Sequence, residues 1–181
     1  MFRLLPEKPR DLYEVEMLFD LAFAPGRQAL SSYQLRDGVA PFADLCLIAR
    51  DEYDSVSGAI RYWPIAIQGE AADDRPAPTW PALLLGPIAV HTTRQGEGLG
   101  ALLIAETLDR ARAAGWSRVL LVGDAPYYAR FGFRRALAAA LDFPRPVNPE
   151  RVLATELSPN AMRDVAGTVV KWPDDIAAEP R

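Results

Sequence analysis

The chain has 181 residues, 50% of them hydrophobic and 24% charged, with a net charge of −4. This length and composition predict a single globular domain, placed at residues 1–172, and a disordered tail at 173–181. The acidic balance argues against a nucleic-acid partner, because nucleic-acid-binding surfaces are usually basic. No apolar run reaches the roughly 18 residues of a membrane span, so no membrane partner is expected. One cysteine and the lack of a signal-peptide pattern predict a cytoplasmic protein.

The first half of the chain alternates between helical and strand patterns. We expect a strand at 2–5, a helix at 9–23, a weaker helix at 29–39, and strands at 44–50 and 56–67. Residues 68–81 contain three prolines and several charges, which predict a mobile loop. Cys46 falls within an apolar strand pattern and is interpreted as a buried core thiol.

The second half predicts a strand, a helix and a further strand in direct succession. The expected elements are strands at 82–90, 118–122, 151–157 and 167–172 and helices at 98–114 and 126–131. A strand–helix–strand unit favours a right-handed crossover and parallel pairing, so the chain is of the α/β class. Gly86-Pro87 interrupts the apolar strand, and because proline cannot donate to a neighbouring strand, we expect a bulge there. Residues 134–150 give no clear pattern.

Three glycines, Gly96, Gly98 and Gly100, stand at every second position where the expected helix begins. They allow backbone N–H groups to turn toward an anion, and the helix adds its unpaired N–H groups and positive dipole end. A phosphate site is therefore predicted, although a glycine-rich helix start without a ligand is an alternative. The dinucleotide fingerprint also fits, through Ala101 and an acid at Asp124, but five residues separate the strand from the first glycine. No Gly-Lys-Ser/Thr follows, which excludes a P-loop.

A second motif follows the next expected strand and decides between these interpretations. Together the two motifs resemble the GNAT superfamily of acetyl-CoA-dependent N-acetyltransferases, most closely over residues 82–134. The residues that carry the resemblance are Gln95, Gly98, Gly100, Tyr128, Gly132 and Phe133. The resemblance implies a GNAT fold, in which helices flank a mixed β-sheet of about six to seven strands. It also implies that this sheet splays between its fourth and fifth strands.

The resemblance implies acetyl-CoA as co-substrate and no metal. The glycine loop would hold the pyrophosphate, and the preceding strand would pair with the pantetheine amides. The residues expected to bind coenzyme A are Ile88, Ala89, Val90, Gln95, Gly96, Glu97, Gly98, Leu99 and Gly100.

Two residues are candidates for the catalytic proton transfers. Tyr128 would be the general acid that protonates the leaving thiolate, and its alternative role is that of a packed aromatic side chain. Asp124 is a candidate base, and its alternative role is to cap the short helix that begins at Pro126. Tyr127 is interpreted as a packing residue.

Several neighbouring residues depart from the family pattern or have open roles. Glu97 stands where many relatives carry Lys or Arg, so its carboxylate is expected to point to solvent. Leu121 stands where many relatives carry Asn. Arg94 is a candidate for a charge beside the phosphates, and His91 is interpreted as structural or solvated.

The predicted function is acetyl transfer from acetyl-CoA to a primary amine of an unidentified small molecule or peptide. A non-catalytic acyl-CoA-binding regulatory module is the alternative, and a dinucleotide-dependent protein is a third possibility. The Pro25-Gly26-Arg27 break, Tyr33 and Arg36 belong to the region that covers the acceptor site in relatives. Dimers are common in the family, which leaves a homodimer open.

Overall fold

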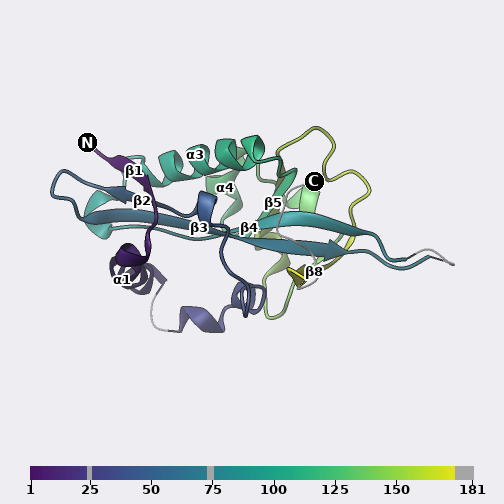
Figure 1. Cartoon of the computed structure of the whole chain (residues 1–181). Helices are drawn as coiled ribbons and strands as arrows, with labels where there is room; N and C mark the ends of the chain where they lie inside the picture. The colour runs from purple at the N-terminus through teal and green to yellow at the C-terminus, as the bar shows by residue number, and fades with distance from the viewer. Residues whose placement is uncertain (24–25, 73–75, 174–181) are drawn as a thin grey trace.

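The structure is a computed structural model that describes residues 1–23, 26–72 and 76–173. Its eight strands form one open sheet in the order β1-β2-β3-β4-β5-β7, with β8 paired to both β3 and β6 (Figure 1). The strands are β1 (Arg3–Pro6), β2 (Leu47–Arg50), β3 (Val56–Gln68), β4 (Thr79–Val90), β5 (Arg118–Val122), β6 (Leu141–Asp142), β7 (Val152–Glu156) and β8 (Gly167–Lys171). The expected mixed sheet flanked by helices is confirmed, with β6 as an additional short strand.

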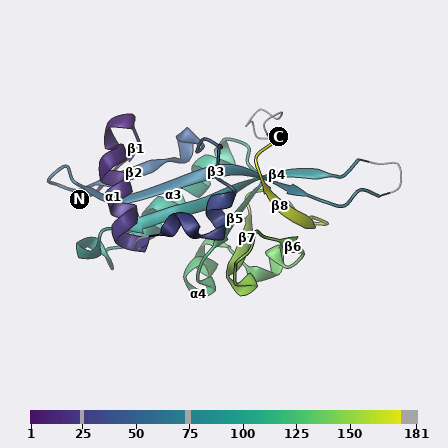
Figure 2. The same ribbon diagram turned by 90° about the horizontal axis from the view of Figure 1, so that it is seen from below.

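The helices lie on both faces of this sheet. They are α1 (Leu12–Phe23), α2 (Ser31–Gln34), α3 (Leu99–Ala113) and α4 (Ala125–Tyr128). Short 3-10 turns occupy Pro9–Asp11, Arg27–Ala29, Ala43–Leu45, Thr92–Arg94, Ala129–Phe131, Arg135–Ala138 and Pro149–Arg151. Figure 1 shows α3 on one face and α1 with α2 on the other, and Figure 2 shows α1 crossing the strands from below. None of the helices in the described ranges is both long and apolar enough to cross a membrane.

Each long helix buries one apolar stripe against the sheet, as the helical spacing of its sequence predicts. The buried stripe of α3 consists of Leu99, Leu103, Ile104, Leu108 and Ala111, and that of α1 consists of Val15, Leu18 and Phe19. A buried hydrogen bond of 2.9 Å between the hydroxyls of Tyr62 and Thr107 also joins β3 to α3. The sheet is thereby held between two layers that fix the position of the α3 N-terminus.

The bulge expected at Gly86-Pro87 is present in β4. Ile60 of β3 pairs with Ile88, whereas Tyr62 pairs with Leu85, so Arg61 alone lies opposite two residues of β4. Two residues facing one is the definition of a β-bulge, and it bends the strand at that point. The bulge therefore lies midway along β4, where that strand leaves β5.

The sheet splays between β4 and β5, as the resemblance implied. These strands pair in parallel at only two positions, Leu83 with Val119 and Leu84 with Leu120. Beyond Leu84, β4 continues along β3, while β5 pairs with β7 on its other edge. One edge of β4 is left without a strand partner within the described chain.

Three of the expected elements differ from those in the structure. The helix expected at 29–39 is wrong: only α2 and a preceding 3-10 turn form, because the serines at 31 and 32 are weak helix formers and Gly38 adopts φ +73°. The strand expected at 44–50 begins at Leu47, after a 3-10 turn. The loop expected at 68–81 is shorter, because Gln68 pairs with Thr79 in a projecting β3–β4 ribbon (Figures 1 and 2). Residues 73–75 of that loop and 174–181 of the expected tail lie outside the described residues.

A chain of ion pairs joins the sheet to the segment before α2. Arg61 of β3, which is buried, lies 2.6 Å from Glu7 and 2.6 Å from Glu16 of α1. Glu16 also pairs with Arg27, whose Nη1 donates to the Tyr33 hydroxyl at 2.7 Å. The network therefore extends from the part of β3 that faces the bulge to the edge of the pocket described next.

Candidate functional site

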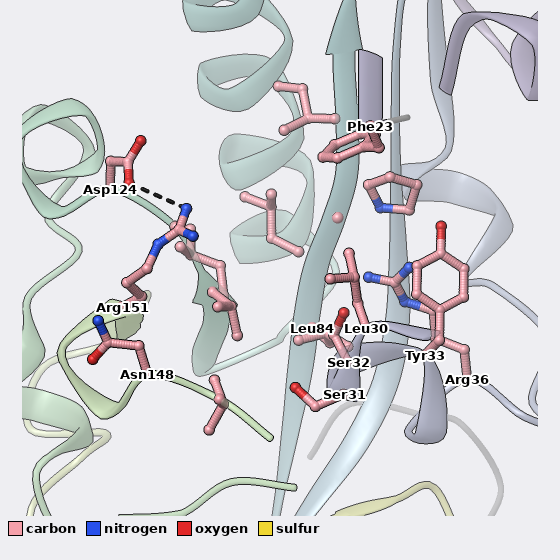
Figure 3. Close-up of a pocket in the computed structure, with 18 of the residues that line it drawn as sticks. Phe23, Leu30, Ser31, Ser32, Tyr33, Arg36, Leu84, Asp124, Asn148 and Arg151 are labelled. Atoms are coloured by element: carbon pink, nitrogen blue, oxygen red, sulfur yellow. Dashed lines mark ion pairs between the residues drawn. The ribbon is translucent and has the colours of Figure 1, made fainter. Parts of the chain in front are cut away.

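The splay between β4 and β5 opens into a pocket of about 510 Å³. One wall is the bulged part of β4, residues 84–88, and the other is formed by residues 121–124 and Tyr128. The segment around α2 and the loop at 146–148 complete the lining (Figure 3). Its volume lies within the usual range for a small-molecule site, roughly 300–1,000 Å³.

The open edge of β4 continues from this pocket and holds the three strand residues expected to bind coenzyme A, of which Ile88 lines the pocket. Ala89 is buried, whereas Ile88 and Val90 are half-buried, and all three pair with β3 on the opposite edge. Backbone groups that find no neighbouring strand can pair with an extended, amide-containing ligand as an added strand would.

The glycine loop follows directly and leads into α3. Gly96 and Gly98 have φ of +84° and +79°, left-handed conformations that glycine adopts at little cost. The Gln95 side-chain amide donates to the Val90 carbonyl at 3.4 Å, which ties the loop to the end of β4. The first N–H groups of the helix beginning at Leu99 have no intrahelical acceptor, and the helix dipole is positive there. The loop can therefore hold an anion.

The two motifs, far apart in the sequence, meet at this helix start. A Cβ placed on Gly100 would lie only 2.9 Å from the Tyr127 hydroxyl oxygen, so a larger residue at position 100 would displace Tyr127. Tyr127 does pack as expected, with Tyr128 at 5.0 Å between ring centroids and the Arg130 guanidinium 4.3 Å from its own ring. That its hydroxyl also reaches the α3 N-terminus could not be read from the sequence.

Tyr128 is held in the wall of the pocket by aromatic contacts. Its ring meets those of Tyr127 and Phe133 edge-on, and a Cβ placed on Gly123 would lie 2.9 Å from its Cδ2 atom. Burial raises the pKa of Tyr128 to about 12, so the phenol is protonated at neutral pH. Within the described chain its hydroxyl makes no hydrogen bond, which leaves the proton available to a bound group.

Asp124 begins α4 but does not cap it with its side chain. Its backbone carbonyl accepts from the N–H groups of Tyr127 and Tyr128 at 3.0 and 3.2 Å, while its side chain makes no capping hydrogen bond. The carboxylate instead lies 3.1 Å from Arg151, which follows the loop that lines the pocket (Figure 3). The capping interpretation is thus correct for the backbone and wrong for the side chain.

Arg94 already holds carboxylates, which weakens its candidacy as a phosphate ligand. Its guanidinium lies 3.0 Å from both Asp51 and Glu52, and 3.8 Å from Glu97. These contacts fix the turn after β4 to the β2–β3 hairpin. The Glu97 side chain is 46% exposed, as expected for a carboxylate that points to solvent.

Two further candidates from the sequence have structural roles. His91 accepts a hydrogen bond from the Thr93 N–H at the start of the turn after β4. Cys46 is buried, and burial raises its pKa to about 11, so the thiol is a poor nucleophile at neutral pH. Among the described residues, no group of three or more His, Cys, Asp or Glu side chains has the arrangement of a metal site.

The far wall carries functional groups that sequence reasoning did not place. Asn148 and Arg151 face the pocket from residues 146–151, part of which the sequence left without an assignment, and no local motif marks them. Arg36, from the region said to cover the acceptor site, lies beside Tyr33 on the opposite side (Figure 3). The pocket thus has a phenol, an ion pair and a guanidinium at its edges.

The protein has a glycine-rich helix start beside a splayed mixed sheet, and comparisons with known proteins identify its family. The family model for the acetyltransferase (GNAT) domain matches residues 43–135. The uncharacterized N-acetyltransferase YhbS of Escherichia coli strain K12 is 30% identical over 164 residues, covering 90% of this chain and 92% of that protein. The chain belongs to the GNAT acetyltransferase family.

Solved structures agree with this assignment. The crystal structure of Escherichia coli YhbS in complex with CoA has a TM-score of 0.76 and 27% identity, covering 94% of this chain and 89% of that one. A GNAT family acetyltransferase from Brucella melitensis in complex with acetyl-CoA has a TM-score of 0.67 and 27% identity, covering 95% and 96%. Both relatives therefore share the fold over nearly their whole length.

Proposed function

We propose that this chain transfers the acetyl group of acetyl-CoA to a primary amine of a small molecule or peptide. The observation that carries the proposal is a pocket lined by the bulged part of β4 and by Tyr128, whose hydroxyl is unpaired in the described chain. The glycine-rich start of α3 lies beside it, against the Tyr127 hydroxyl next to Tyr128. The CoA and acetyl-CoA complexes of the two relatives support coenzyme A as the occupant. Residues 1–172 would constitute one catalytic domain.

The proposed binding residues are those expected from the sequence, supported by the unpaired edge of β4 and the left-handed glycines before α3. The N–H groups of residues 95–100 would hold the pyrophosphate, and the backbone of Ile88, Ala89 and Val90 would pair with the pantetheine arm. The acetyl group would then lie in the splay beside the bulge at Gly86. A backbone N–H near the bulge would polarise the thioester carbonyl, an oxyanion-hole contribution of about 3 kcal/mol.

The reaction is a direct transfer. The amine nitrogen attacks the thioester carbon, the new N–C bond forms, the C–S bond breaks, and coenzyme A leaves as a thiolate. Tyr128 gives its proton to that sulfur. The proton that the amine releases passes to a base, for which Asp124 is the candidate on the same wall of the pocket, directly or through water.

The proposal is tested by a panel of primary amines incubated with acetyl-CoA and the protein. Release of free thiol, followed by mass spectrometry of an acetylated product, is the expected result. Binding of coenzyme A without thiol release for any amine would instead favour a regulatory module. A fluorescence titration with NADH tests the dinucleotide alternative, and we expect no binding.

Replacing Glu97 by lysine is expected to tighten coenzyme A binding. The substitution exchanges a negative for a positive charge beside the proposed pyrophosphate site, and it also removes the pairing with Arg94. Exposed charges near a helix N-terminus have modest effects, so Kd should fall by about threefold to tenfold at low salt. Calorimetric titration measures this, with Asp109→Lys, a 77% exposed position near the other end of α3, as the control. A weaker affinity than that of the wild type would contradict the prediction.

Replacing Gly123 by alanine is expected to displace the Tyr128 ring. The added Cβ would lie 2.9 Å from Cδ2 of that ring and 3.0 Å from Leu121 Cδ1, so the phenol must move. A misplacement of about 1 Å can lower a rate by about 10²-fold, and we expect kcat to fall on that scale with little change in the Kd of coenzyme A. Steady-state kinetics and thermal unfolding of the same variant measure the two effects. Full activity in a folded variant would mean that the ring position does not matter.

A further inference from the structure

Arg36 is a half-buried cation with which no carboxylate of the described chain pairs. Its Nε and Nη1 atoms are inaccessible to solvent, and no hydrogen-bond acceptor reaches either of them. Its Cζ atom lies 4.2 Å from the centroid of the Tyr33 ring and 4.9 Å from that of Trp63, so aromatic faces hold the guanidinium in place. Unpaired buried donors are costly to a protein, which points to a partner supplied from outside the chain.

The three buried arginines of the described chain each pair with two carboxylates. Arg27 pairs with Glu16 and Asp20, Arg50 with Asp11 and Glu14, and Arg61 with Glu7 and Glu16. Arg36 has no such partner, although Arg27 and Arg61 place further positive charge near it. Arg118, which also has no carboxylate partner among the described residues, donates to the backbone carbonyls of Ala161 and Pro81, whereas Nε and Nη1 of Arg36 have no acceptor of either kind.

The unpaired guanidinium lies where an acceptor would have to bind. Arg36 lines the pocket, and its Nη2 atom would be 3.7 Å from a Cβ placed on Gly86, the residue at the bulge. Arg151 on the opposite wall is a weaker candidate for binding an anion, because it is 51% exposed and already pairs with Asp124 (Figure 3). Among the described residues that line the pocket, Arg36 is the cation without a carboxylate partner, and its Nη2 atom is the one that lies toward Gly86.

We propose that Arg36 binds a carboxylate of the acceptor, so that the substrates are small amino carboxylates. The proposal rests on the proposed function, which puts the reacting thioester beside the same bulge. Amine and carboxylate must then lie only a few bonds apart, as in an α-amino acid. Phe23, Leu30 and Val147 line the pocket as well and give an apolar side chain a surface to pack on.

Matched acceptors test the proposal on the unaltered protein. Leucine, leucinamide and 3-methylbutylamine share one side chain and an amine, but only leucine has a carboxylate. We expect kcat/KM for leucine to exceed the other two by about 10²-fold, because an unpaired buried charge is expensive. An equal or higher kcat/KM for leucinamide and 3-methylbutylamine would overturn the proposal. A preference for O-phosphoethanolamine over leucine and β-alanine would overturn the choice of carboxylate over phosphate.

Variants test whether the preference for a carboxylate depends on Arg36. Arg36→Met is expected to reduce the leucine preference over 3-methylbutylamine by about 10²-fold without changing the Kd of coenzyme A. Arg10→Met is the control, because it makes the same change at a 77% exposed position in the N-terminal turn. If Arg36→Met does not fold, Arg36→Lys should retain part of the preference, since lysine keeps the charge but loses the planar fork. Unchanged selectivity in a folded Arg36 variant would refute the assignment.

A binding measurement separates this inference from the proposed function. We expect 4-methylpentanoate, which has the leucine side chain and carboxylate but no amine, to bind the coenzyme A-loaded wild type and not Arg36→Met. If it does so and no amine releases thiol, the carboxylate site stands and the proposed activity fails. If amines react without any preference for carboxylates and 4-methylpentanoate does not bind, the activity stands and this inference fails.

Discussion

Replacing Tyr128 by phenylalanine is expected to lower kcat for acetyl transfer by about 10²–10⁴-fold, the usual contribution of a positioned proton donor. The substitution removes only the hydroxyl, and because that hydroxyl makes no hydrogen bond in the described chain, the aromatic packing with Tyr127 and Phe133 should persist. The Kd of coenzyme A and the unfolding temperature should therefore remain close to those of the wild type. Steady-state kinetics with the best amine of the panel, together with calorimetric titration of coenzyme A, measure both.

The pKa of Tyr128 adds a prediction about pH. Since burial raises that pKa to about 12, the acid form persists throughout the neutral and moderately alkaline range. The wild type should then show no decline in kcat between about pH 8 and 10 from loss of this proton.

The matched control for Tyr128→Phe is Tyr53→Phe, which makes the same change at an 80% exposed tyrosine. A turnover number for Tyr128→Phe within twofold of the control would remove the acid assignment.

Replacing Arg61 by methionine is expected to lower the free energy of unfolding by about 3–5 kcal/mol, the usual cost of breaking a buried ion pair from one side. Arg61 is buried and holds Glu7, whose side chain is 11% exposed, as well as Glu16. Without Arg61, Glu7 has no counter-ion in this network and Glu16 retains only Arg27. Urea unfolding monitored by circular dichroism measures the loss.

The control for this prediction is Arg112→Met. Arg112 pairs with Asp109 at 2.7 Å, but the two side chains are 53% and 77% exposed, so removal should cost less than about 1 kcal/mol. Adding Glu7→Gln to Arg61→Met should restore part of the lost free energy of unfolding, because it removes the carboxylate charge that Arg61→Met leaves without a partner. A loss below 1 kcal/mol for Arg61→Met would show that the network contributes little to stability.

The same network predicts how stability depends on acid. Burial alone would raise the pKa of Glu16, but hydrogen bonds from Arg61 and Arg27 outweigh it and hold that pKa below its usual value. The associated stability is present above the pKa of the unfolded chain and is lost as the pH falls through the lower folded value. Arg61→Met should therefore lose less stability than the wild type when the pH falls below about 4.5.

The sequence predicted well wherever one local pattern controls the structure. The α3 stripe, the glycine loop and the bulge at Gly86-Pro87 follow from helical spacing, left-handed conformations and the missing proline donor. The helix expected at 29–39 is shorter because Ser31, Ser32 and Gly38 are poor helix formers, and the contact of Arg36 with Trp63, which local propensity does not show, also acts on this segment. Tertiary contacts of this kind decide weakly helical segments.

The residues of the candidate site were likewise only partly predictable from the sequence. The glycine loop and Tyr128 were proposed from motifs, but the pairing of Asp124 with Arg151 joins residues 27 positions apart. The unpaired state of Arg36 is a property of its surroundings and has no signature in the sequence. Long-range electrostatics therefore had to come from the structure.

The most direct test of the account is a crystal structure of the protein with acetyl-CoA. We predict that the pyrophosphate contacts the N–H groups of residues 96–100, that the pantetheine arm pairs with β4, and that the thioester sulfur lies within about 4 Å of the Tyr128 hydroxyl oxygen. A donor bound elsewhere, or a sulfur on the far side of the pocket from that hydroxyl, would contradict the account.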